Sequence, residues 1–241
     1  MPKLLMLFIC WHSMHVISLE ISNPPDIIGT AFDNKQQLLY TEEHRYLSDT
    51  SHHIIYKEPD GFIFSEKKIS YKTSFLAPEF VQSNQRNNEY IAINYNDITN
   101  INSLFRKDGK HPIKKVSLAL NINDTLALVI DAGFDHFIRQ YWQKINHSNQ
   151  LAFNFLSTTR QSIIKLVIKE KPCAENRSYR CFIVTPKNWL LKLIAGQINL
   201  QYNRQQQLLV FEGISNIADK NNDYKHVFIR YQHLKNIHSK P

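Results

Sequence analysis

Apolar and polar residues alternate along most of the 241-residue chain, a pattern typical of half-buried β-strands. Pro59-Asp60-Gly61 marks a tight turn between two of these runs and predicts a hairpin. The runs expected as strands are 27–32, 38–47, 53–56, 62–71, 79–82, 90–95, 113–120, 126–130, 151–155, 163–169, 179–185, 198–202, 208–212 and 226–231.

One segment follows a helical period instead and predicts an amphipathic helix over 132–146. Its apolar positions are Phe134, Phe137, Ile138, Tyr141, Trp142 and Ile145. We expect Asp131 to cap its N-terminus and Asp135 to pair with Arg139 one turn later. Two further short helices are expected, at 101–106 and at 189–195.

The serial strands lack a repeating βαβ spacing, and this arrangement predicts an α+β fold that is mainly antiparallel. We expect a curved sheet or half-barrel with one or two packed helices. Because no Pro- or Gly-rich linker divides the chain, residues 19–241 are expected to form a single β-rich domain.

The first eighteen residues have the layout of a secretory signal peptide. Lys3 supplies the positive charge, 4–11 form a short apolar stretch, and Val16 and Ser18 precede the expected cleavage site. A buried N-terminal strand is the alternative, and a lipoprotein signal at Cys10 is disfavoured by the large Ile9 before it. The mature protein is therefore expected to be exported, periplasmic or secreted, with no transmembrane segment.

Signal removal would leave two cysteines, Cys173 and Cys181, at the ends of two strand-like runs. A hairpin would bring them opposite each other, which predicts a disulfide. Two buried free thiols are the alternative. The spacing, without a nearby histidine pair, does not suggest zinc.

The net charge of +8 is spread along the chain, including Lys67-Lys68, and is interpreted mainly as solvated faces. Neither a dense basic helix nor a nucleic-acid motif is present, so no nucleic-acid partner is expected. An anionic lipid or cell-wall polymer is the alternative partner for such a surface. Only six glycines occur, and there is no phosphate-binding loop, so no cofactor is expected.

The densest polar cluster lies on the second strand, where alternation places Tyr40, Glu42, His44 and Tyr46 on one face. A Glu42–His44 pair suits acid–base chemistry, because histidine titrates near neutral pH. The alternatives are an edge strand or a buried pair satisfied by a basic partner such as Arg160.

Three further features are candidates for ligand contacts. Arg160 suits a carboxylate or phosphate, although a structural ion pair explains it as well. Tyr141 and Trp142 would line a ligand cavity or pack as core. Asp131 and Asp135 with His136 resemble a metal site, but capping and dipole effects explain the two carboxylates, and no metal is expected.

The segments YTEEH, DAGFDHFIRQYW, FNFLSTTR and FEGISN, with the PDG hairpin and its lysine-rich strand, resemble a group of exported bacterial proteins of unknown function. The strand order in INLQYNRQQQLLVFEGISN is similar to the half-barrel of periplasmic lipoprotein carriers. The second resemblance implies a curved sheet that holds acyl chains.

Together these features predict an exported protein that binds an apolar or amphiphilic ligand such as a lipid or lipoprotein. The absence of a catalytic motif makes an enzyme the less favoured interpretation. Two alternatives stand beside it: a hydrolase-like enzyme that uses Glu42 and His44, and a structural envelope protein that binds another protein through a sheet edge.

Overall fold

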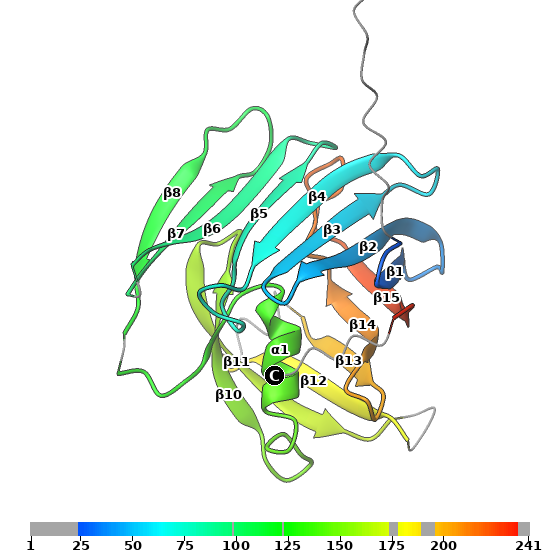
Figure 1. Cartoon of the computed structure of the whole chain (residues 1–241), viewed down its shortest axis with the longest axis vertical. Helices are drawn as coiled ribbons and strands as arrows, with labels where there is room; N and C mark the ends of the chain where they lie inside the picture. Colours follow the sequence, from blue (N-terminus) through cyan, green and yellow to red (C-terminus); the bar gives the residue numbers. More distant parts are fainter. Residues whose placement is uncertain (1–23, 98, 122, 174–177, 189–195, 236–241) are drawn as a thin grey trace, which may run out of the picture.

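The computed structural model describes residues 24–97, 99–121, 123–173, 178–188 and 196–235 (Figure 1). Within them, fifteen strands form one sheet. The strands are β1 (Ile27–Phe32), β2 (Leu38–Ser48), β3 (Ser51–Lys57), β4 (Ile63–Ser70), β5 (Glu79–Asn84), β6 (Glu89–Asp97), β7 (Asn100–Arg106), β8 (Lys114–Ala119), β9 (Leu128–Val129), β10 (Leu151–Ser157), β11 (Ser162–Lys171), β12 (Arg180–Pro186), β13 (Ile198–Tyr202), β14 (Leu208–Ile214) and β15 (His226–His233).

The first and last strands of the chain lie side by side at the centre of the sheet. β1 pairs with β2 on one side and with β15 on the other. From this centre, β1 to β8 form a meander in one direction and β15 back to β10 form a meander in the other. Every neighbouring pair is antiparallel except β9 with β10. The expected mainly antiparallel sheet is therefore confirmed.

The sheet curves strongly without closing, and its two halves bend around the helix α1 (Gly133–Gln140), as Figure 1 shows. The two halves of the sheet also meet through a side chain. Gln161, in the turn between β10 and β11, donates from Nε2 to Ser103 O on β7 (2.7 Å) and Lys114 O on β8 (3.1 Å). The result is an open barrel with α1 in its hollow.

Two apolar cores fill the concave side. One lies against β1 to β7 and includes the buried side chains of Ile54, Phe64 and Ile93. The other lies beneath α1 and includes Phe137 and Phe182. The start of α1 sits tightly on the loop after β4. A Cβ atom on Gly133 would lie only 1.9 Å from Leu76 O, so that position requires glycine.

The helix is shorter than its apolar stripe predicts. The backbone leaves helical geometry at Tyr141 (φ −100°, ψ 15°) and continues as turns. The amide of Ile145 still donates to Tyr141 O (3.1 Å), which keeps Trp142 and Ile145 on the buried face. The expected ion pair between Asp135 and Arg139 is confirmed at 2.8 Å.

Three sequence-based expectations are wrong. Asp131 does not cap α1, whose N-cap is Ala132, because its carboxylate binds Lys67 instead. Residues 101–106 form most of β7 rather than a helix, held by ladders to β6 and β8. Lys67 is not on a solvated face, since it is completely buried, whereas Lys68 is exposed.

The expected disulfide is present between Cys173 and Cys181, whose Cα atoms are 5.4 Å apart. β11 pairs with β12 up to the Lys171–Cys181 position, which brings the two cysteines together across the hairpin. Such a bond is compatible with an oxidising, exported compartment. The predicted signal (1–18) and the second helix (189–195) lie outside the described residues. Within the described part of the chain, no helix has the length and apolarity needed to span a membrane.

Candidate functional site: a buried polar cluster on a cavity

A cavity of about 580 Å³ lies between the concave face of the sheet and α1. Its lining divides into two kinds of surface. The apolar part includes Ile54, Phe134, Phe155, Leu166, Ile198, Leu208, Phe211 and Ile229. The polar part includes Glu42, His44, Tyr46, His52, Tyr56, Tyr71, Asp131, Asp135, His136, Arg139 and Tyr231.

The polar part begins on β2, where alternation turns Glu42, His44 and Tyr46 toward the cavity. The strand register then aligns other residues with Glu42. Gly29 on β1 lies opposite both Glu42 and Tyr231, and Tyr56 on β3 lies opposite Glu42 on its other side. A Cβ atom on Gly29 would be 2.8 Å from Tyr231 Cε1, so the missing side chain leaves room for the tyrosine ring.

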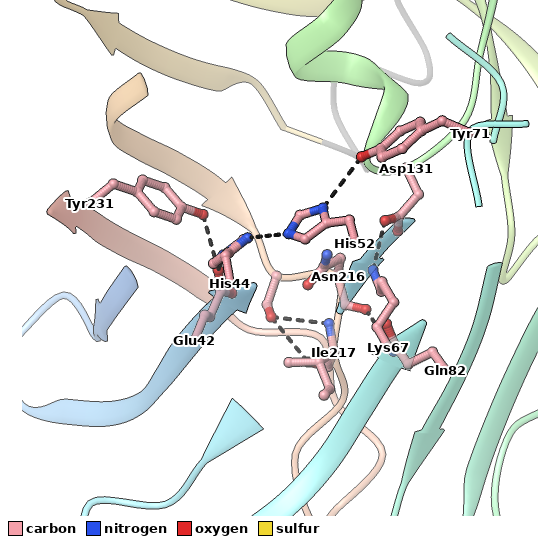
Figure 2. Close-up of polar contacts among 11 residues, drawn as sticks. Glu42, His44, His52, Lys67, Tyr71, Gln82, Asp131, Asn216, Ile217 and Tyr231 are labelled. Carbon is pink, nitrogen blue, oxygen red and sulfur yellow. Dashed lines mark hydrogen bonds and ion pairs between the residues drawn. The ribbon is translucent and has the colours of Figure 1, made fainter. Parts of the chain in front are cut away.

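A chain of hydrogen bonds connects this cluster (Figure 2). Tyr231 donates its hydroxyl to Glu42 Oε2 at 3.1 Å, and His44 Nε2 lies 3.3 Å from the same oxygen. The other ring nitrogen of His44, Nδ1, is 3.1 Å from His52 Nε2. His52 Nδ1 in turn lies 3.4 Å from the hydroxyl of Tyr71. Five side chains from three strands and the loop after β4 thus form one network.

The proton positions in this network follow from burial and charge. Burial, followed by the nearby His44 and Lys67, lowers the pKa of His52 well below its usual value, so this ring is neutral at neutral pH. Burial and the neighbouring Glu42 raise the pKa of Tyr231, so its hydroxyl stays a donor. Tyr231 is therefore the donor in its bond to Glu42 Oε2.

Glu42 lies at the end of this hydrogen-bond network, and only one of its two carboxylate oxygens has a hydrogen-bond partner among the described residues. Oε2 receives Tyr231 and His44, whereas Oε1 has no hydrogen-bond partner among the described residues. Only 4% of Glu42 is exposed. Oε1 is not sealed from the cavity, so it can accept a hydrogen bond from something that enters there.

A second polar group is the buried ion pair between Lys67 Nζ and Asp131 Oδ1, at 2.6 Å (Figure 2). The side chain of Lys67 has no exposed surface, and its ammonium also lies 5.2 Å from the centre of the Phe80 ring. Asp131 adopts a left-handed backbone (φ 41°), a conformation that aspartate tolerates better than most residues. The pair neutralises itself within the wall of the cavity.

The helix supplies the third polar group. Asp135 binds Arg139 and accepts the Tyr202 hydroxyl at 2.9 Å. His136 packs edge-on to Tyr71, with ring centres 4.8 Å apart. Burial and then Arg139 lower the pKa of His136 to about 4. Asp131, Asp135 and His136 therefore bind different partners, and no three metal-ligating side chains gather anywhere in the described ranges.

Among the candidates from sequence, Glu42 and His44 meet on the cavity and Asp131, Asp135 and His136 also line it, but Arg160, Tyr141 and Trp142 do not. Arg160 is exposed in the β10–β11 turn and does not line the cavity. Trp142 packs against Phe182 in the core beneath α1, with ring centres 5.6 Å apart. Tyr141 packs beside Phe137 and does not line the cavity either.

Sequence reasoning missed His52, Tyr71, Tyr231, Lys67 and Gly29. Alternation on the third strand would have placed His52 on the face of Tyr56, which is a usable signal. The contributions of Tyr231 and Gly29 depend on the pairing of β1 with β15, and residues about 200 positions apart give no local signal of such pairing.

Comparison with known proteins identifies no activity. Neither a protein-family model nor a curated protein matches this chain. Among solved structures, one match is the beta-barrel-like protein of domain of unknown function DUF1849 from Brucella abortus. It is 7% identical, the match covers 88% of this chain and 97% of that chain, and the TM-score is 0.48.

Proposed function

We propose that this protein is an exported binding protein that holds a small amphiphilic molecule, such as a lipid or the acyl part of a lipoprotein, in the cavity beside α1. The observation that carries the proposal is the division of the cavity lining into an apolar part and a buried polar cluster. An amphiphile has the same division, with a chain for one part and a polar end for the other.

The size and chemistry of the cavity support this function. Sites for small molecules usually have volumes of roughly 300–1,000 Å³, apolar walls and a few polar groups that orient the ligand. The cavity of about 580 Å³ falls within that range. Leu166, Ile198 and Phe211 would contact the chain, and Glu42 would contact the polar end. Export is supported by the signal-like N-terminus and by the disulfide.

Mass spectrometry of the purified protein under native conditions tests the proposal, with solvent extraction to identify anything bound. We expect an added mass that organic solvent removes. Leu208→Trp should abolish it by filling the cavity, whereas Ile163→Trp, at an exposed position, should leave it. A protein that carries no ligand and binds no amphiphile when offered one would contradict the proposal.

An acid–base enzyme is the second candidate, because Glu42 and His44 lie 3.3 Å apart and face a cavity. In the described structure, however, His44 bonds only to Glu42 and His52, and no hydroxyl or thiol nucleophile touches it. Hydrolysis of nitrophenyl esters by the wild type, lost in His44→Gln, would favour the enzyme. Equal rates in the two proteins would exclude this role.

A further inference from the structure

We infer that the polar end of the ligand is a cation, an alkylammonium group that donates an N–H bond to Glu42 Oε1. This inference rests on the proposed function and specifies its ligand class. Three observations carry it: the charge balance of the cavity, the unmatched carboxylate oxygen, and the aromatic rings beside it.

The charges around the cavity cancel in pairs except at Glu42. Lys67 neutralises Asp131, and Arg139 neutralises Asp135. The other titratable groups that face the cavity are the imidazoles of His44, His52, His136 and His233, together with tyrosine hydroxyls. Among the described residues of the lining, Glu42 is the carboxylate that no Lys or Arg pairs with, which favours a cation and disfavours an anion.

The geometry at Glu42 selects a donor. Oε2 already receives Tyr231 and His44, and Oε1 has no partner in the described part of the chain, although the side chain is nine-tenths buried. An ammonium group would supply the missing bond as a charge-assisted hydrogen bond. It would also place a positive charge beside the carboxylate, which no Lys or Arg in the described lining does.

The rings beside Glu42 suit the same group. Tyr56 on β3 lies directly opposite Glu42. On the other side of Glu42, Gly29 on β1 separates it from Tyr231 on β15. Both tyrosines line the cavity. Faces of aromatic rings attract cations, most strongly where water is excluded. A fatty-acid carboxylate would instead meet Glu42 as a second negative charge, and the cavity should reject it.

Calorimetric titration with decylamine, decanol and decanoate tests the inference, because the three probes share one chain and differ in charge. At about pH 8, above the ordinary titration range of imidazole and below that of an alkylamine, decylamine is a cation. For wild-type protein freed of bound ligand, we expect decylamine to bind at least about tenfold more tightly than decanol. Decanoate should bind most weakly.

The variant Glu42→Gln keeps the shape of the side chain and removes its charge. It should bring the affinities for decylamine and decanol to within about threefold of each other. Glu66→Gln, on the outer face of β4, changes the net charge equally and should preserve the wild-type ranking. The wild-type ranking needs no variant, so it tests the inference even when Glu42→Gln fails to fold.

Two outcomes would overturn the inference while leaving the proposed function intact. They are decanoate binding as tightly as decylamine, and an unchanged preference for decylamine in Glu42→Gln. Failure of all three probes to bind would contradict the proposed function itself, and the inference with it.

Discussion

The two faces of β2 each carry a glutamate, and the two glutamates have different hydrogen-bond partners. On the outer face, Glu43 accepts hydrogen bonds from Arg45 at 2.6 Å and from Lys57 at 2.5 Å. On the inner face, the neighbouring Glu42 meets only a tyrosine and an imidazole, and one of its oxygens has no partner within the described ranges. The more deeply buried carboxylate is the one that no Lys or Arg pairs with in the described structure.

This contrast separates a structural carboxylate from a binding one. Partial burial alone would raise the pKa of Glu43, but the hydrogen bonds from Lys57 and Arg45 lower it, so the folded protein stabilises its charge. Such partly exposed pairs contribute modestly to stability. A buried carboxylate without a cation costs free energy, and proteins keep such costly groups where they serve binding or chemistry.

The largest effect on stability is expected at the buried ion pair between Asp131 and Lys67. Asp131→Asn would leave Lys67 buried without an ionic partner and should lower the free energy of unfolding by about 3–5 kcal/mol. Urea denaturation measures this loss. The double variant Lys67→Met with Asp131→Asn should recover most of it. A loss below about 1 kcal/mol in the single variant would mean that the pair contributes no more than a surface contact.

The inner histidines should make stability depend on pH. Burial and Arg139 hold the pKa of His136 at about 4, whereas the unfolded chain takes up this proton near 6.5. The stabilising contribution of the neutral His136 to the free energy of unfolding should therefore be complete above about pH 6.5. It should fall by about 2–3 kcal/mol as the pH drops to about 4.5, because the unfolded state binds more protons. His52, whose pKa is also lowered, acts in the same direction.

Urea denaturation between about pH 7 and pH 4.5 measures this dependence above the main titration range of the carboxylates. His136→Gln should flatten the curve. The control is His53→Gln, on the outer face beside Glu66, which should leave the slope as it is. Identical slopes in the wild type and His136→Gln would show that this ring does not carry the dependence.

A smaller loss is expected from Gly29→Ala, which would push a methyl group against the Tyr231 ring and Glu42 Oε2. Overpacking of this kind costs about 1–3 kcal/mol, despite the gain that alanine usually brings to a strand. Gly109→Ala, where only the Asn88 side chain is close, should change stability by less than about 0.5 kcal/mol. Equal thermal melting shifts in the two variants would contradict the close contact at Gly29.

The contrast between the faces was partly readable from sequence. Alternation on the second strand separated Glu42 and His44 from Glu43 and Arg45, and the structure keeps that division. Burial of Lys67 could not be read in the same way, because its partner Asp131 lies 64 residues away and is held by a left-handed turn. Alternation is a local property, but neutralisation of a buried charge depends on which distant strands pair.

The same limit applies to the fold. Period-two alternation predicted most of the strands and the mainly antiparallel sheet. The helix ended earlier than its apolar stripe, because the stripe continues through turns that bury the same side chains. The aromatic residues Tyr141 and Trp142 were offered as ligand contacts, but their helical spacing could not distinguish core packing from cavity lining.

The measurement that tests the central claim most directly is the free energy of unfolding of Glu42→Gln beside that of Glu43→Gln, both without ligand. We expect a loss of stability in Glu43→Gln and no loss in Glu42→Gln. Glu43→Gln should lose about 1 kcal/mol or less, since it gives up an ion pair near the surface. Glu42→Gln should lose nothing or gain about 1 kcal/mol, since it removes a buried charge that no cation neutralises. A loss of several kcal/mol in Glu42→Gln would show that this carboxylate holds the fold together and would contradict its role as a binding group.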